Sequence, residues 1–171
     1  LIYNAAELDA VRCDQNAYYK LMNNINLSSF SNWEPIGNAN NEFYGSFDGN
    51  NKTVTNLTIN RPNEFFIGLF GAVNEAPGVG GDKSAKAKEK STLGVIKDLY
   101  IQNANISGKG YVGILAGSIA TTDSIKNVHT SGNVNGSSYG VGGIAGNLSL
   151  SSIENCSSNG NVFASEGVGG L

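Results

Sequence analysis

The feature that most constrains the fold of this chain is an internal repeat with a period near 28 residues. One pattern reads apolar, any residue, Asn or Asp, apolar, and its polar position is filled by Asn56, Asp98, Asn127 and Asn155. A second, glycine-rich pattern carries an apolar residue at Leu69, Leu115, Ile144 and Leu171. The first marker recurs after 42, 29 and 28 residues, and the second after 46, 29 and 27. Fixed periods of this size are typical of solenoids and other stacked repeat folds.

The repeat unit favours strands over helices. No stretch of it keeps apolar residues at helical spacing, and its short apolar runs are broken by Asn, Ser and Gly. Three short strands per unit fit the period, and units stacked about 4.8 Å apart would form parallel sheets. Because crossovers between parallel strands are nearly always right-handed, the sequence predicts an all-β, right-handed parallel β-helix with about 28 residues per coil.

The repeat also predicts which residues form ladders. We expect one interior apolar ladder of Val54, Ile96, Ile125 and Ile153, and a second of Leu57, Leu99, Val128 and Cys156. The Asn or Asp between them marks a bend, because asparagine tolerates left-handed backbone and its amide can bond to the next coil. The apolar residues of the second pattern, Leu69, Leu115, Ile144 and Leu171, are expected to form a third ladder. A glycine recurs after it, where a tight corner requires positive φ or close backbone contact; these glycines are Gly71, Gly117 and Gly146.

The chain is expected to be one domain over residues 1–171, with residues 1–50 forming an N-terminal cap and first coil. Asn4 and Glu7 resemble a capping box and predict a short helix from about Ala5 to Arg12. Trp33 and Phe47 are expected to plug the core. Residues 51–171 form the coils, and the chain stops within a repeat, which predicts a longer protein with further repeats.

A polar insertion over residues 75–92 interrupts the first interval of the repeat and is read as a loop. Its lysines make it a candidate contact surface, since loops on rigid scaffolds often bind partners; they are Lys83, Lys86, Lys88 and Lys90. The alternative is a solvated insertion without a ligand.

Composition excludes several classes of function. A net charge of −3 gives no basic surface for nucleic acid, and no apolar run is long enough to span a membrane. Cys13 and Cys156 lack the spacing of a zinc or redox site, and we expect no disulfide between them. Gly140 to Ala145 fits a dinucleotide-binding fingerprint, but no helix start follows it, so these glycines are assigned to a corner.

Four motifs in order resemble the GLUG-motif repeat domain: Trp33-x-Pro35-Ile36-Gly37, Gly45-x-Phe47-Asp48-Gly49-Asn50, Asn56-Leu57 and Gly68-Leu69-Phe70-Gly71. The resemblance implies a bacterial secreted or cell-surface protein. The chain is similar to modules of adhesin-like proteins and to accessory regions of metallopeptidases that cleave immunoglobulin A. Those peptidases carry H-E-x-x-H in a separate zinc domain, which is absent here, where His129 is the single histidine. The resemblance therefore transfers no catalytic residue.

Three functions stay open at this stage. The first is a non-catalytic module that acts as an adhesin stalk or binds a host protein or glycan; tyrosines that could stack on sugars are Tyr18, Tyr19, Tyr44, Tyr111 and Tyr139. The second is a polysaccharide-cleaving enzyme, which would need paired carboxylates such as Glu42 with Asp48, or Asp98 with Asp123. The third is a structural spacer. We expect no catalytic, cofactor-binding or metal-binding residue.

Overall fold

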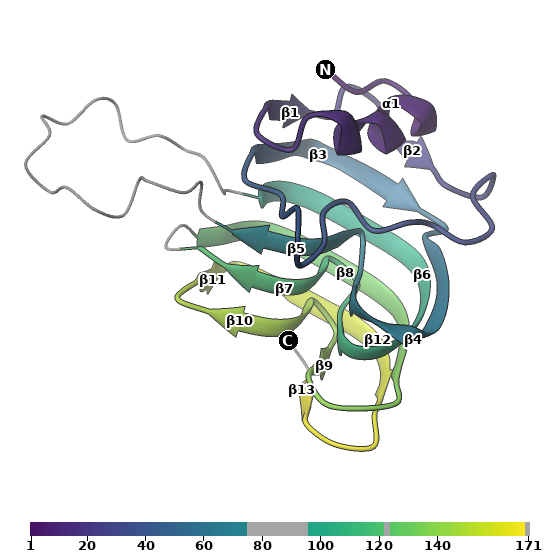
Figure 1. The fold of residues 1–171 in the computed structure, drawn as a ribbon. Helices are drawn as coiled ribbons and strands as arrows, with labels where there is room; N and C mark the ends of the chain where they lie inside the picture. Colours follow the sequence, from purple (N-terminus) through teal and green to yellow (C-terminus); the bar gives the residue numbers. More distant parts are fainter. Residues whose placement is uncertain (75–95, 122–123, 170–171) are drawn as a thin grey trace, which may run out of the picture.

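The computed structural model describes residues 1–74, 96–121 and 124–169. It is built almost entirely of β-strands, with one short helical segment at the N-terminus (Figure 1). The strands are β1 (Tyr18–Lys20), β2 (Ile25–Asn26), β3 (Ser46–Thr55), β4 (Thr58–Ile67), β5 (Phe70–Asn74), β6 (Ile96–Val112), β7 (Ala116–Ala120), β8 (Ser124–Gly136), β9 (Val141–Gly142), β10 (Ala145–Ser149), β11 (Ser152–Glu154), β12 (Ser157–Phe163) and β13 (Val168–Gly169). The prediction of an all-β fold is confirmed.

The strands pair in parallel, and each repeat unit lies on the unit before it. β3 pairs with β6, β6 with β8, and β8 with both β11 and β12, while β5, β7 and β10 form a second parallel sheet. Residues 28 apart stand opposite each other, as Ile153 does to Ile125 and Val162 to Val134. Figure 1 shows the layers following one another from α1 at one end to β12 and β13 at the other.

The predicted N-terminal helix is present, but it tightens after five residues. It comprises α1 (Ala5–Asp9) followed by a 3₁₀ turn over Ala10–Cys13. The Asn4 side chain caps it by accepting the Glu7 N–H at 3.0 Å. Leu8 and Val11 are fully buried, so this segment covers one end of the core.

The core is one continuous apolar cluster between the sheets. Trp33 and Phe47 are fully buried within it, and the Trp33 indole N–H donates to the Leu69 carbonyl at 3.2 Å. Thr130 occupies an interior position, where its hydroxyl donates to the Gly143 carbonyl at 3.0 Å. Since the hydroxyl has a partner, a polar residue is accommodated in the core without an unsatisfied group.

Two predicted ladders are wrong in their first member. Val54 stands opposite Ile101 rather than Ile96, whose partner in β3 is Phe47. Leu57 likewise lies level with Ala104 instead of Leu99, because Thr58 pairs with Asn105.

The register that pairs Val54 with Ile101 spans 47 residues, five more than the predicted 42, and β3 also contains a bulge. Asp48 pairs with Lys97 and Lys52 with Leu99, so three residues of β3 oppose one of β6. Since Thr55 pairs with Gln102, the equivalent of Asn56 in the next unit is Asn103, one corner further along than Asp98. The third ladder has the expected alignment: Leu69, Leu115 and Ile144 each precede residues that pair with one another. Leu171 lies outside the described residues.

The predicted loop over residues 75–92 also falls outside the described residues, together with Lys83, Lys86, Lys88, Lys90 and Asp123.

Candidate functional site

The first bend of each unit is formed by asparagine or aspartate, and we name it the asparagine corner. Asp98, Asn127 and Asn155 have φ angles of 53°, 52° and 52°, in the left-handed region. The Asn127 amide donates to a carboxylate oxygen of Asp98 at 2.7 Å. In β3 the same corner contains Asn50 and Asn51, also at positive φ. These residues serve the backbone turn and the stacking of units.

The second bend changes its residue type along the molecule. Asn56 and Asn103 have φ angles of 60° and 56°, and their amides form a chain with Asn26 at 2.9 and 2.5 Å. In the two following units the positive-φ residues near this bend are Gly132, which pairs with Ala104, and Gly160, at φ 147° and 143°. Asn56 was expected beside Asp98, Asn127 and Asn155, and the structure places it in this separate ladder.

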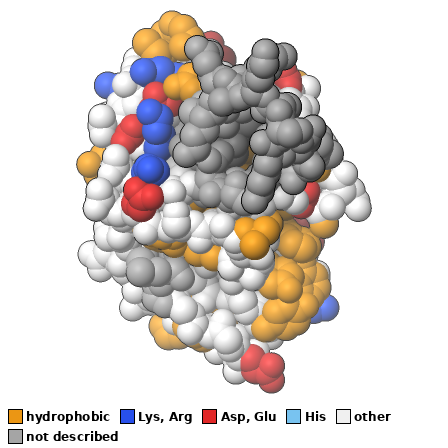
Figure 2. Space-filling view, turned by 90° about the vertical axis from the view of Figure 1, so that its left-hand side faces the viewer, with side chains coloured by type: hydrophobic (Ala, Val, Ile, Leu, Met, Phe, Trp, Pro, Cys, Tyr) orange, Lys and Arg blue, Asp and Glu red, His pale blue; other side chains and the backbone are white. Residues whose placement is uncertain are grey.

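A column of charged side chains runs beside the asparagine corner. Figure 2 shows basic and acidic side chains following one another along one side of the molecule. The strand register places successive charges opposite each other in the order Lys20, Asp48, Lys97, Lys126 and Glu154. The Lys126–Glu154 pair is at 3.1 Å and exposed. The column joins neighbouring units by ion pairs.

Asp48 is the most enclosed charge of this column. Its side chain is 7% exposed and lies 3.4 Å from the Lys20 ammonium and 3.9 Å from that of Lys97. Burial raises its pKa, but hydrogen bonds from the Asn50 N–H and the Tyr18 hydroxyl, with the two lysine charges, outweigh burial and hold the pKa below its ordinary value. Asp48 is therefore kept as a charged acceptor, which is unsuited to a general acid.

The carboxylates proposed for sugar cleavage are already engaged. Lys97 contacts Asp98 at 3.6 Å as well as Asp48. Glu42 accepts hydrogen bonds from Tyr44 at 3.1 Å and Asn74 at 2.9 Å. Within the described ranges no three His, Cys, Asp or Glu side chains gather as a metal site would require. Cys13 and Cys156 are free thiols.

The third bend holds aromatic residues at positions where the backbone favours glycine. Phe66 and Tyr111 have φ angles of 62° and 50°, and the equivalent residues of the next two units are Gly140 and Gly167, at 68° and 60°. A bulky residue in this region costs on the order of 1–3 kcal/mol. The backbone therefore does not explain why rings stand there.

The preceding position alternates with this one. Phe65 pairs with Gly110, and Tyr139 follows at the same level of the next unit, where its carbonyl accepts the Tyr111 N–H at 3.1 Å. Each glycine leaves room for a ring from the neighbouring unit. A Cβ on Gly110 would lie 2.8 Å from the Phe65 ring, and one on Gly140 would lie 2.9 Å from that of Tyr111. At the position of Phe65, ring and glycine therefore alternate from one unit to the next.

The result is a continuous cluster of four rings, which we name the aromatic corner: Phe65, Phe66, Tyr111 and Tyr139. Ring centroids lie 5.2 Å apart for Phe66 and Tyr111, 5.1 Å for Tyr111 and Tyr139, and 6.0 Å for Phe65 and Tyr139. Tyr139 is 46% exposed. The exposed Lys109 places its ammonium 5.0 Å from the centre of the Phe65 ring.

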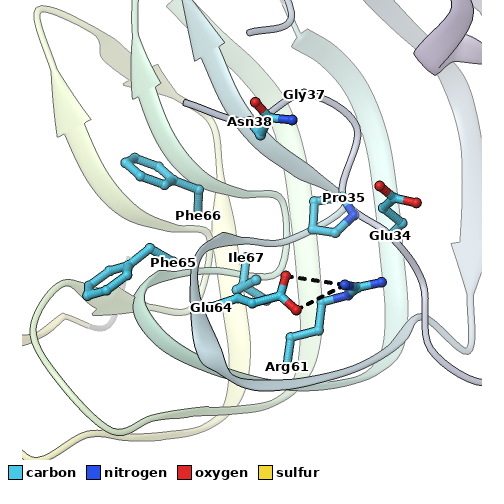
Figure 3. Close-up of a pocket in the computed structure, with 9 residues that line it drawn as sticks. All are labelled: Glu34, Pro35, Gly37, Asn38, Arg61, Glu64, Phe65, Phe66 and Ile67. Carbon is cyan, nitrogen blue, oxygen red and sulfur yellow. Dashed lines mark hydrogen bonds and ion pairs between the residues drawn. The ribbon is translucent and has the colours of Figure 1, made fainter. Parts of the chain in front are cut away.

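A polar pocket of about 110 Å³ adjoins this corner. Its lining residues are Glu34, Pro35, Gly37, Asn38, Arg61, Glu64, Phe65, Phe66 and Ile67. The Arg61 guanidinium donates to both Glu64 carboxylate oxygens at 3.2 Å and to the Trp33 carbonyl at 3.3 Å. Figure 3 shows this ion pair on one side and the rings of Phe65 and Phe66 turned away from it.

The predicted corner glycines lie behind the aromatic corner. A Cβ on Gly117 would stand 2.5 Å from the Phe66 Cα, and one on Gly146 would stand 2.5 Å from the Tyr111 carbonyl carbon. A Cβ on Gly71 would stand 2.1 Å from the Gly37 carbonyl oxygen. None of these three glycines has positive φ. Of the two expected reasons for glycine, close backbone contact is therefore the one that applies.

Two of the five tyrosines proposed for sugar stacking, Tyr111 and Tyr139, meet in the aromatic corner. The Tyr19 hydroxyl donates to the Asp14 carbonyl at 2.5 Å, and Tyr44 is bound to Glu42. Tyr18 is 55% exposed beside the charged column. Sequence reasoning missed Phe65 and Phe66. The signal that could have found them is the set of aligned pairs Phe-Phe, Gly-Tyr and Tyr-Gly in three successive units. These pairs align only in the correct register.

His129 lies on the outer surface of the sheet. Its Nδ1 is 2.8 Å from the Ser157 hydroxyl, and its ring stacks on Tyr100 at 5.1 Å. Both contacts run between neighbouring units. None of the helices in the described part of the chain is both long and apolar enough to cross a membrane.

Comparisons with known proteins agree with this architecture. An alignment of 150 positions is 34% identical to halomucin of Haloquadratum walsbyi, and covers 81% of this chain but 1% of that protein. An alignment of 82 positions, which covers 44% of this chain and 10% of the relative, is 38% identical to a candidate Gly-rich membrane protein of Evansella cellulosilytica. The chain thus spans a small part of the relatives it matches.

The fold is shared with a solved structure. The crystal structure of a candidate immunoglobulin A1 protease from Bacteroides ovatus superposes with a TM-score of 0.63 at 21% identity, over 94% of this chain and 47% of that one. The family model described as the GLUG motif matches residues 137–162, which include Tyr139, Gly146 and Asn155. This chain therefore carries the GLUG motif, and the family resemblance inferred from its sequence is confirmed.

Proposed function

We propose that this chain is a non-catalytic repeat module of a secreted or cell-surface protein, and that it binds carbohydrate through the aromatic corner. Its coils would form one right-handed parallel β-helix over residues 1–171, capped by residues 1–50. The names of the relatives, a mucin and a membrane protein, support a location outside the cell. The parallel stacking of units supports the solenoid.

The observation that carries the binding role is the placement of Phe66 and Tyr111 at positive φ. Equivalent corners elsewhere in this chain use glycine, so the rings are kept at a cost in folding free energy. Such an outlier points to a role for the side chain outside folding. Rings of this kind offer apolar faces to the C–H groups of a sugar, and a tyrosine hydroxyl can bond to its oxygens.

Rigid support makes the surface suitable for binding. The rings come from three successive units, and Gly110 and Gly140 hold them in contact. Side chains whose positions are fixed before binding lose little conformational entropy when a ligand arrives. The adjoining pocket supplies Asn38 and the Arg61–Glu64 pair as polar groups at the edge of the surface.

A glycan-binding screen tests the proposal, followed by titration calorimetry with the best oligosaccharide. We expect the double variant F65A/Y139A to weaken binding by at least about tenfold, because stacked aromatic anchors dominate such interfaces. Y18A removes an exposed tyrosine outside the corner and is the matched control, which should bind like the wild type. Equal binding by all three proteins would refute the assignment of the site, and a screen without any ligand would favour a structural spacer.

The enzyme alternative has less support. Lys97 brings Asp48 and Asp98 to one place, but both carboxylates are ion-paired. Burial, followed by the hydrogen bond to Asp48, raises the pKa of Tyr18, which keeps this phenol protonated. Chromatography of polysaccharides incubated with the protein would detect cleavage, and loss of cleavage in D48N would contradict the non-catalytic proposal.

A further inference from the structure

We propose that the aromatic corner selects sugars that carry a carboxylate, and that Lys109 is the residue that recognises it. This inference rests on the proposed carbohydrate binding and names the class of ligand. It depends on where the free cations of the molecule lie in relation to the rings.

Lys109 is an exposed cation that the fold has not neutralised. Ion pairs within 4.0 Å, counted over residues 1–74, 96–121 and 124–169, use five cations: Arg12, Lys20, Arg61, Lys97 and Lys126. Lys109 takes part in none of them and is held over the Phe65 ring at 5.0 Å. A cation placed over an aromatic face is favourable, and it leaves the ammonium hydrogens free for a ligand.

The position of Lys109 in β6 directs its charge to the rings. Its neighbours Gly108 and Gly110 pair with Arg61 and Phe65 of β4. Arg61 is the other cation on this side, but its guanidinium is already engaged by Glu64. Among the residues that the structure describes, a sugar lying on the rings would therefore meet one available positive charge. A hydrogen bond between an ammonium and a carboxylate is about twice as strong as a neutral one.

Glu166 offers a test with the opposite sign. Val168 pairs with Val141, so Glu166 stands at the level of Tyr139 in the following unit. Glu166 is exposed, and its place in the register is one unit beyond Tyr139, on the side away from Phe65. A negative charge there disfavours an anionic ligand, and its removal should strengthen binding of the acidic sugar alone.

The experiment compares two forms of one oligosaccharide, tetragalacturonic acid and its fully methyl-esterified derivative, by titration calorimetry. The backbone is the same and only the charge differs. We expect the wild type to bind the acid form about tenfold more tightly at low salt. K109Q should remove this preference while keeping the affinity for the ester, and E166Q should strengthen binding of the acid form alone.

Each outcome distinguishes the two proposals. Equal affinity for acid and ester in the wild type, or an unchanged preference in K109Q, overturns the role of Lys109. If binding of the ester still depends on Phe65 and Tyr139, carbohydrate binding stands although this inference fails. If the wild type binds neither form, this inference fails, and the glycan screen described above decides the proposed function separately. Circular dichroism of K109Q and E166Q checks that both variants are folded.

Discussion

The asparagine corner and the aromatic corner make the same backbone conformation with different residues. Asn127 adopts φ 52° and Tyr111 adopts φ 50°. At the first corner the side chain suits the conformation and also bonds to the unit above, as Asn127 does to Asp98. At the aromatic corner, a bulky residue such as Tyr111 is disfavoured in this conformation, and its ring contacts other rings on the surface.

The difference separates residues that the fold requires from residues that it tolerates. A position filled by asparagine at positive φ is explained by backbone preference and by the ladder of amides. A position where phenylalanine or tyrosine alternates with glycine is not explained in this way. The aromatic corner is therefore the place in the described chain where the sequence departs most clearly from the rule of its own repeat.

The largest expected effect concerns the support of the aromatic corner. Gly117→Ala would place a Cβ 2.5 Å from the backbone of Phe66, which cannot move without opening the strand pairing. We expect a loss of about 2–3 kcal/mol in the free energy of unfolding, measured by urea denaturation. Gly167→Ala is the matched control, since it meets no atom closer than 3.3 Å but has φ 60°; it should cost about 1 kcal/mol. Equal costs would mean that close contact does not explain Gly117.

The asparagine corner should respond to residue type in the opposite way. Asn127→Ala strains the backbone at φ 52° and removes the hydrogen bond to Asp98, at a cost of about 2 kcal/mol. Asn127→Gly removes the bond but fits the conformation, and should cost about 1 kcal/mol less than the alanine variant. The two midpoints of urea denaturation give the comparison. If alanine and glycine are equally destabilising, backbone preference is not what selects asparagine here.

The pH dependence of stability tests the bulged copy of the asparagine corner in β3. Asp48 accepts the Asn50 N–H at 2.8 Å, and its folded pKa lies below the unfolded value near 3.8. A lowered folded pKa stabilises the fold at pH values above the unfolded pKa, and this contribution is lost as pH falls through the folded pKa. We expect a small effect, below about 1 kcal/mol, as for most partly exposed ion pairs.

Urea midpoints of the wild type and D48N between pH 6 and pH 3 measure this effect, in a range chosen to bracket about pH 4, where carboxylates titrate. The wild type should lose more stability than D48N as the pH falls. Parallel curves would show that Asp48 does not contribute through its charge. Lys126→Gln alters the same charged column without touching Asp48 and should leave the difference between the two curves unchanged.

The sequence predicted the repeat, the strand class and the helix at Ala5, because period and turn residues are local signals. It failed on register where the chain departs from its period. The Asn marker recurred after 42 residues and the apolar marker after 46, a mismatch that arises because Asn56 and Asp98 are not equivalent residues. The correct partner of Asn56 is Asn103, 47 residues on. Asn56 and Asp98 both stand at positive φ, so residue preference alone does not tell which of two corners each one occupies.

The aromatic corner was hidden for a related reason. Phe65 and Phe66 precede the insertion at residues 75–92, while Tyr111 and Tyr139 follow it. Their equivalence depends on the strand register, which the insertion obscures in the sequence. The alternation of rings with glycines also removes the simple repetition that would mark a ladder. Structure was needed to show that different residues at one position complete a single surface.

The smallest expected effect tests whether the preference for asparagine at the asparagine corner also holds at the aromatic corner. Tyr111→Asn and Tyr111→Ala both remove the ring, so both lose its contacts with Phe66 and Tyr139. Asparagine tolerates φ 50° better than alanine does, and we expect the asparagine variant to be more stable by about 0.5 kcal/mol, measured by urea denaturation. Binding of an oligosaccharide should fall equally in both. If Tyr111→Asn is more stable than Tyr111→Ala but binds the oligosaccharide as weakly, the ring is kept for its surface and not for the fold. Equal stability of the two variants would remove the backbone argument on which the site rests.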